Sequence, residues 1–217
     1  MAKTFAVLGL GRFGRGVAQA LYESGAEVMV VDKDDELLRQ FSSQATYAVP
    51  ADLSDEDEVK NLGLGGMDAV IVAMGMDLAA SILCVMIAKE AGVPLVIAKA
   101  RSKRMGEILT RIGADKIIFP ESESGIRVAR SLTSKYYIDN FDISQNVCIL
   151  EMSAKDDWIG KTLNELNLRK KYHVNVIAIK SAGSSEFNHL FDIAEPIAEG
   201  DSMLLIIDKA QMDRLIG

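Results

Sequence analysis

Cysteine, proline and tryptophan are scarce in this sequence, and basic residues are fewer than acidic ones. Its 217 residues include 2 cysteines, 4 prolines and 1 tryptophan, and only 6% are aromatic. Cys84 and Cys148 stand apart in apolar segments, so we interpret them as core thiols rather than as a disulfide or a metal site. The formal net charge of −7 argues against a nucleic-acid-binding protein, which usually has a basic face.

Long hydrophobic runs are also missing. The longest apolar stretch, from Leu78 to Ala88, is interrupted by Ser81, and it is shorter than the roughly 18 residues that a membrane-spanning helix needs. The N-terminal residues do not have the pattern of a signal peptide. With 49% hydrophobic and 25% charged residues, the chain can bury a core, and we expect a cytoplasmic globular protein.

The sequence does contain a glycine-rich loop directly after a strand-like run. Phe5-Ala6-Val7-Leu8 leads into Gly9-Leu10-Gly11-Arg12-Phe13-Gly14. In dinucleotide-binding folds the first glycine makes a tight turn, the second lets the backbone approach a pyrophosphate, and the third lets helix and strand pack closely. The loop therefore predicts an adenine nucleotide with its phosphates at the helix start. A glycine turn kept only for close packing is the alternative.

Two charged residues near the loop fit a nucleotide. Asp32 closes the second predicted strand, about 20 residues past the loop, where a carboxylate can accept hydrogen bonds from ribose hydroxyls. Arg12 is a cation at a helix N-terminus, a position that the helix dipole disfavours. A bound phosphate would account for Arg12, because the planar guanidinium suits phosphate oxygens. A solvated arginine at the helix start is the other interpretation.

Strands and helices alternate through the first part of the chain. The predicted strands are Phe5–Gly9, Glu27–Asp32, Tyr47–Pro50, Ala69–Ala73, Leu95–Lys99 and Lys116–Phe119. The predicted helices are Phe13–Ser24, Asp34–Ser43, Asp55–Leu62, Asp77–Ala91, Ser102–Gly113 and Glu121 to about Lys135. Several strands are apolar on both faces, as in a parallel sheet covered by helices. The pattern predicts an α/β fold of Rossmann type, with a doubly wound parallel sheet.

Further candidate residues follow the predicted strands, because ligands of such sheets lie beyond the carboxyl ends of the strands. These residues are Asp52, Leu53, Met74, Gly75, Lys99, Arg101 and Glu121. A carboxylate beside phosphates is repulsive unless a cation intervenes, so Glu121 is a candidate ligand of Mg²⁺ or Ca²⁺. Glu121 as a charge that only stabilises the start of its helix is the alternative.

The pattern changes after the sixth predicted strand. Tyr136-Tyr137-Ile138-Asp139-Asn140-Phe141 is aromatic, and we interpret it as a linker, with exposed apolar side chains that a partner subunit covers. A linker that packs on its own domain is the alternative. Predicted strands at Val147–Met152, Asn175–Lys180 and Ser202–Ile207 and a helical region at Thr162–Tyr172 then indicate a small α+β domain. The expected organisation is a nucleotide-binding domain over 1–135, a linker over 136–144 and a C-terminal domain over 145–217.

The assembled motifs resemble the KtrA/TrkA regulators, which are cytoplasmic subunits of potassium transporters built from RCK domains. The resemblance rests on residues 5–14, 70–75, 99–100, 112–118 and 120–121, and more loosely on 168–172, 175–180 and 199–201. It implies a homo-oligomer, from a dimer to an octameric ring, that docks on a membrane subunit similar to KtrB or TrkH. The protein would then lie on the inner face of the cell membrane.

The resemblance also implies a ligand and a set of contacts. ATP and ADP would compete for the crevice, and NAD(H) or AMP would bind in some members. Arg12 would contact the terminal phosphate, Asp32 and Lys33 the ribose region, and Glu121 a divalent cation. The remaining contacts would come from Asp52 and Leu53 at the adenine, and from Met74, Gly75, Lys99 and Arg101 at the ribose and phosphates.

For the C-terminal domain the resemblance implies a possible cyclic di-AMP site. Arg169, Asn175 and Ile177 match positions associated with that ligand in relatives. A dimerisation module without a ligand is the alternative, because Phe187-Asn188-His189-Leu190-Phe191 departs from the short polar hairpin expected there.

The function expected from the sequence is therefore non-catalytic sensing of a nucleotide. An NAD-dependent oxidoreductase is one alternative, but the C-terminal segment offers no evident catalytic constellation of His, Lys, Tyr or Ser. An NADH-responsive redox sensor is another, but it would need a DNA-binding module that this acidic chain does not show.

Overall fold

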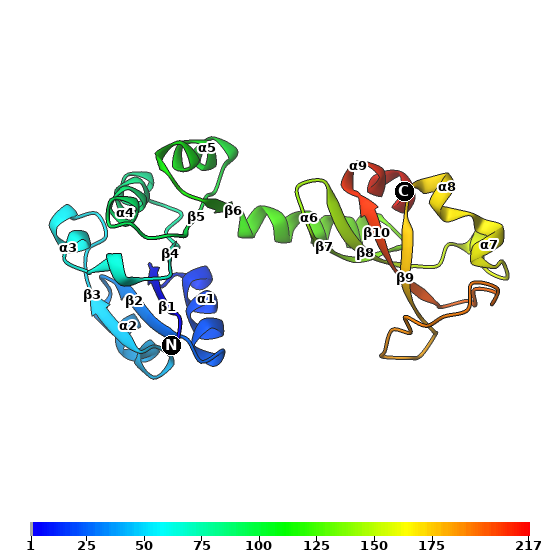
Figure 1. The fold of residues 1–217 in the computed structure, drawn as a ribbon, viewed down its shortest axis with the longest axis horizontal. Coiled ribbons are helices and arrows are strands. Elements are labelled where there is room, and N and C mark those ends of the chain that lie inside the picture. Colours follow the sequence, from blue (N-terminus) through cyan, green and yellow to red (C-terminus); the bar gives the residue numbers. More distant parts are fainter. Residues whose placement is uncertain (1) are drawn as a thin grey trace. The chain divides into compact units, whose positions relative to one another are not determined.

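The computed structural model describes residues 2–217 and divides into two compact units, Met1–Glu123 and Ser124–Gly217. The division falls inside helix α6 (Pro120–Thr133), earlier than the boundary at residue 135 that we expected. Each unit has its own sheet (Figure 1). The buried apolar residues form separate clusters in the two units.

The first unit is built on a parallel six-stranded sheet in the order β3-β2-β1-β4-β5-β6. Its strands are β1 (Thr4–Leu8), β2 (Glu27–Asp32), β3 (Tyr47–Pro50), β4 (Ala69–Val72), β5 (Val96–Lys99) and β6 (Lys116–Ile118). The helices between them are α1 (Arg12–Glu23), α2 (Asp35–Phe41), α3 (Glu56–Lys60), α4 (Leu78–Glu90) and α5 (Lys103–Ile112), with 3₁₀ turns at Ser42–Gln44 and Leu64–Gly66. The predicted Rossmann-type fold is confirmed, with element ends shifted by a few residues.

Two cores cover the two faces of this sheet. Because side chains alternate along a strand, Ala6 and Leu8 of β1 pack into one core, while Val7 packs into the other. The first core includes Cys84 of α4 and Leu109 of α5, and the second includes side chains of α1 and α2. The apolar strands of the sequence are therefore buried on both faces, as a doubly wound sheet requires.

Cys84 and Cys148 are free and buried, which confirms their interpretation as core thiols. Burial raises the pKa of the Cys84 thiol to about 12, so this side chain stays protonated and unreactive at neutral pH.

The second unit contains a four-stranded antiparallel sheet in the order β7-β8-β10-β9. Its strands are β7 (Tyr137–Asp142), β8 (Val147–Ser153), β9 (Asn175–Lys180) and β10 (Ser202–Asp208). Its other elements are a 3₁₀ turn at Asp156–Trp158 and helices α7 (Leu163–Leu166), α8 (Leu168–Tyr172) and α9 (Lys209–Ile216). Trp158 is fully buried in the core of this unit, beside Tyr172.

Our interpretation of residues 136–144 as a linker is wrong. Most of this segment forms β7, an edge strand that pairs with β8. The strand forms because its backbone pairs with β8, with a bulge between Tyr137 and Asp139, and because Tyr137 is buried in the core of this unit. The sequence analysis also missed α9, whose apolar residues Met212 and Leu215 are buried.

Candidate functional site

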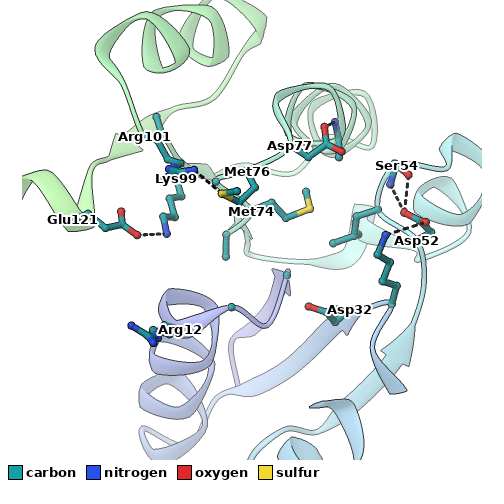
Figure 2. Close-up of a pocket in the computed structure, with 18 of the residues that line it drawn as sticks. Arg12, Asp32, Asp52, Ser54, Met74, Met76, Asp77, Lys99, Arg101 and Glu121 are labelled. Carbon is teal, nitrogen blue, oxygen red and sulfur yellow. Dashed lines mark hydrogen bonds and ion pairs between the residues drawn. The ribbon is translucent and has the colours of Figure 1, made fainter. Parts of the chain in front are cut away.

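A cavity of about 850 Å³ opens at the carboxyl ends of the parallel strands. The chain order reverses there between β1 and β4, which are neighbours in the sheet, and ligands of open α/β sheets bind at such points. Twelve of the residues that we predicted line the cavity (Figure 2): Gly9, Gly11, Arg12, Asp32, Lys33, Asp52, Leu53, Met74, Gly75, Lys99, Arg101 and Glu121.

Two predicted residues, Phe13 and Gly14, are not among the residues that line the cavity. A Cβ added at Gly14 would lie 1.9 Å from the carbonyl oxygen of Gly9, so glycine is required there for the close approach of α1 to the loop. Phe13 is half-buried in the first turn of α1, and its ring lies 5.9 Å from the Lys99 ammonium nitrogen. Gly14 therefore acts on the conformation of the loop, and Phe13 contacts a residue that lines the cavity.

Several lining residues were not among the predicted ones, and the polar or sulfur-bearing ones are Ser54, Met76, Asp77 and Ser122. Asp77 was identified from the sequence only as the cap of α4, and its side chain does accept a hydrogen bond from the Ala80 N–H. Ser54 comes two residues after Asp52, and Met76 two residues after Met74, so each extends a loop that the sequence had already indicated.

The glycine loop leaves the start of α1 open toward the cavity. Helices α2, α3, α4 and α5 each have a capping side chain, from Asp34, Asp55, Asp77 and Ser102. At the Gly11 N-cap of α1 no side chain accepts from the helix N–H groups, among the residues that the structure describes. A Cβ at Gly11 would meet no atom within 4 Å, and its φ of −60° is open to any residue. Neither packing nor conformation therefore requires a glycine here.

Asp32 connects the end of β2 to the glycine loop. Its Oδ2 accepts a hydrogen bond of 2.7 Å from the Leu10 N–H, and its Oδ1 accepts one of 3.1 Å from the Asp34 N–H. A carboxylate has about four acceptor positions, so Asp32 keeps lone pairs for hydroxyl donors in the cavity.

A second acidic group follows β3. The Ser54 hydroxyl and N–H both donate to Asp52 Oδ1, at 2.7 and 3.0 Å, and these bonds lower the pKa of the Asp52 carboxyl. Lys33 Nζ lies 3.7 Å from Asp52 Oδ2 on the exposed rim. This end of the cavity is thus rich in acceptors for hydroxyl and amino groups.

The opposite end of the cavity is cationic. Lys99 Nζ donates a hydrogen bond of 2.6 Å to Glu121 Oε1, and this bond lowers the pKa of the Glu121 carboxyl. A guanidinium nitrogen of Arg101 contacts the Met76 sulfur. Figure 2 shows Arg12, Lys99 and Arg101 at one end of the cavity and Asp32 and Asp52 at the other.

A complete metal site is not formed within residues 2–217, where no three His, Cys, Asp or Glu side chains are placed to hold one ion. Glu121 can supply one carboxylate, but its partner in this structure is Lys99. A divalent cation at Glu121 would need further oxygen ligands.

The three residues considered for cyclic di-AMP lie in the second unit. Arg169 is on α8, and Asn175 and Ile177 are on β9, the edge strand of the sheet. Arg169 and Asn175 are exposed, and Ile177 is half-buried.

No helix among residues 2–217 has both the length and the apolar character needed to cross a membrane.

Comparisons with known proteins identify the family of this chain. The TrkA-N domain family matches residues 5–120 and the TrkA-C domain family matches residues 149–216. The Ktr system potassium uptake protein C of Bacillus subtilis (strain 168) is 41% identical over 180 residues, covering 83% of this chain and 81% of the relative. The Ktr system potassium uptake protein A of Vibrio alginolyticus is 36% identical over 204 residues, covering 94% and 92%.

Solved structures share the fold at lower sequence identity. The GsuK channel bound to NAD matches all of this chain with a TM-score of 0.66 and 17% identity, and the match covers 40% of the channel chain. The GsuK structure bound to ADP matches 62% of this chain and 36% of its own, with a TM-score of 0.52 and 15% identity. From the two domain matches and the identity to the Ktr proteins, this chain belongs to the KtrA/TrkA family of potassium uptake proteins.

Proposed function

We propose that this protein is a non-catalytic regulatory subunit of a potassium uptake system and that it senses an adenine nucleotide in the cavity of the first unit. The observation that carries this proposal is the uncapped N-terminus of α1, which opens toward a cavity with a cationic end and an acidic end. Free N–H groups at a helix start form an anion site, and a nucleotide has both a phosphate end and a hydroxyl-rich end.

The charges of the cavity support one orientation of the nucleotide. The phosphates would lie at the glycine loop, within reach of Arg12, Lys99 and Arg101, while Asp32 would accept hydrogen bonds from the ribose. Asp52 and Leu53 would flank the adenine, and Lys33, Met74 and Gly75 would complete the contacts. ATP, ADP, AMP and NAD(H) all share the adenylate part that this arrangement suits, and GsuK structures are bound to NAD and to ADP.

A divalent cation, Mg²⁺ or Ca²⁺, would bind at Glu121 together with nucleotide phosphate oxygens. These oxygens would supply further ligands, because Mg²⁺ is commonly held by one or two carboxylates plus substrate phosphates.

Assembly with further copies of the chain is part of the proposal. Helix α6 has no buried residue, and three of its apolar side chains, Ile126, Val128 and Leu132, are exposed. Phe141 of β7 and Ile143 beyond it are also exposed. Exposed apolar side chains in such numbers mark a protein contact, and a second copy would cover them in a dimer or ring.

The assembly would act on a membrane-spanning subunit, similar to KtrB or TrkH, from the inner face of the membrane. A nucleotide shifts a conformational equilibrium only by its differential affinity for the two states, and contact of its terminal phosphate with Arg12 would supply that difference. In the second unit, Arg169, Asn175 and Ile177 would bind cyclic di-AMP, and a dimerisation role without a ligand is the alternative.

Calorimetric titration of the full chain with ATP, ADP, AMP and NAD tests the proposal. We expect dissociation constants in the micromolar range, and no consumption of NADH when candidate substrates are added. A chain that binds none of these nucleotides would refute the sensing role. Substrate-dependent turnover of NADH would instead favour an NAD-dependent oxidoreductase.

A further inference from the structure

Lys99 and Glu121 form an ion pair at the phosphate end of the cavity. Lys99 is the last residue of β5 and Glu121 lies in the first turn of α6. The Lys99 side chain is 12% exposed, whereas the Glu121 side chain is 67% exposed. The mostly buried Lys99 side chain is therefore held by the residues around it, and the exposed Glu121 carboxylate approaches its ammonium group from the solvent side.

Packing holds the Lys99 ammonium close to the start of α1. Its nitrogen lies 5.9 Å from the centre of the Phe13 ring, in the first turn of that helix. Its Cε would be only 3.2 Å from a Cβ added at Gly75. With its stem held between these neighbours, Lys99 has little freedom to leave Glu121 and follow a ligand to another place.

A phosphate group at the start of α1 would therefore need the same cation that Glu121 already uses. Both groups are anions, and a carboxylate that remains on Lys99 would lie beside the phosphate and repel it. A ligand without a phosphate at this point meets no such competition.

We propose that Glu121 is an internal competitor for Lys99 and thereby sets the selectivity of the cavity for the length of the phosphate chain. In the absence of a divalent cation, ligands whose phosphates reach Lys99 displace Glu121, and ligands without such phosphates bind unhindered. This inference rests on the proposed binding of an adenine nucleotide in the cavity. It assigns Glu121 a role in the free protein that does not depend on a metal ion.

A double-mutant cycle on the full chain tests the inference. The four proteins are wild type, Glu121→Gln, Lys99→Met and the double variant. Methionine keeps most of the apolar stem of Lys99, and glutamine keeps the shape of Glu121. Calorimetry in EDTA gives the dissociation constants of adenosine, AMP, ADP and ATP. Glu107→Gln on α5 is the matched control, because it removes a carboxylate of the same charge that does not line the cavity.

With Lys99 present, we expect Glu121→Gln to tighten binding of ADP and ATP by about three- to tenfold, the range of a partly exposed charged hydrogen bond. Adenosine binding should change by less than about twofold, as should all binding in Glu107→Gln, because neither involves the ion pair. In the Lys99→Met background the gain from Glu121→Gln should disappear. Unchanged thermal unfolding of each variant would show that the fold is intact.

Three results would overturn the inference. An equal gain in both backgrounds would mean that Glu121 only repels phosphate, and a larger gain with Lys99→Met would mean that Lys99 holds both anions at once. An absence of any gain in ADP or ATP affinity would also overturn it while leaving the proposed function intact. The proposed nucleotide sensing itself fails if wild type binds none of the nucleotides.

Discussion

The Asp32 carboxylate accepts a hydrogen bond of 2.7 Å from the backbone N–H of Leu10, which joins the end of β2 to the glycine loop. This bond gives Asp32 a structural role in addition to its proposed contact with the ribose. The two roles predict different results for two substitutions at this position.

Asp32→Ala removes both roles, whereas Asp32→Asn keeps one oxygen that can accept from Leu10. We expect both variants to lose at least about tenfold in ADP affinity, because a charged acceptor for the ribose is lost. Only Asp32→Ala should also lower the free energy of unfolding, by about 1–3 kcal/mol, because it leaves the Leu10 N–H without a partner. Calorimetry and urea unfolding measure the two effects, and equal stability of the two variants would contradict the structural role.

Arg12 is proposed to distinguish ATP from ADP. We expect Arg12→Ala to reduce the ratio of the two affinities by about five- to tenfold, because a charged hydrogen bond to a terminal phosphate is worth roughly 1–2 kcal/mol. Arg15→Ala is the control, since Arg15 is also exposed on α1 but does not line the cavity. The measurement is calorimetric titration with each nucleotide. Equal ratios in wild type and Arg12→Ala would rule out this role.

Alanine is expected to have opposite effects on stability at Gly14 and at Gly16, both in α1. A Cβ at Gly14 would lie 1.9 Å from the Gly9 carbonyl oxygen, whereas a Cβ at Gly16 would meet nothing within 4 Å. We expect Gly14→Ala to destabilise the first unit by about 3 kcal/mol or more, through a backbone overlap. Gly16→Ala should stabilise it by about 0.5–1 kcal/mol, because alanine favours the helix. Thermal unfolding of both variants checks the contrast.

The contacts of the Asp115 carboxylate predict that the stability of the protein depends on pH. The Val96 N–H donates to its Oδ2 at 2.7 Å and Lys89 Nζ lies 3.0 Å away, so that the pKa of the Asp115 carboxyl is lowered, chiefly by the Val96 hydrogen bond. A lowered pKa contributes stability above the unfolded value of about 3.9. That contribution is lost as the pH falls through the still lower folded value.

We therefore expect the free energy of unfolding of wild type to lose this contribution as the pH falls below about 4. Asp115→Asn should lack this part of the acid dependence. The magnitude should be no more than about 1 kcal/mol, because the side chain is partly exposed and solvent screens the pair. Urea unfolding from about pH 3 to about pH 7, at roughly constant ionic strength, measures this contribution. An identical pH profile in the variant would contradict the assignment.

Leu132 of α6 is 81% exposed, and we propose that it lies against a second copy of the chain. Leu132→Glu should lower the mass measured by light scattering at micromolar concentration, because it places a charge in an apolar contact. Ser131→Glu adds the same charge at the neighbouring helix position and should change the mass less. A wild-type chain that is monomeric under these conditions would remove the basis of this prediction.

Local sequence determined much of the first unit. The spacing of Gly9, Gly11 and Gly14 and the doubly apolar strands specified the loop, the parallel sheet and the edge at which the cavity opens. These features depend on the conformational freedom of glycine and on the periodicity of hydrophobic residues, both of which can be read within a short window. Most of the cavity lining was predicted for the same reason, because most of the predicted residues lie at the end of a recognisable strand or shortly after it.

Only the tertiary structure decided how distant residues pair. Lys99 and Glu121 were each expected near phosphates, but their contact depends on how β5, β6 and the start of α6 are placed. Tyr137 enters the core because β8 offers an edge to pair with, and this made β7 a strand where the sequence suggested a linker. Hydrogen bonds and burial of this kind depend on neighbours that are remote in sequence. They therefore cannot be predicted from a residue's own type and its spacing in the sequence.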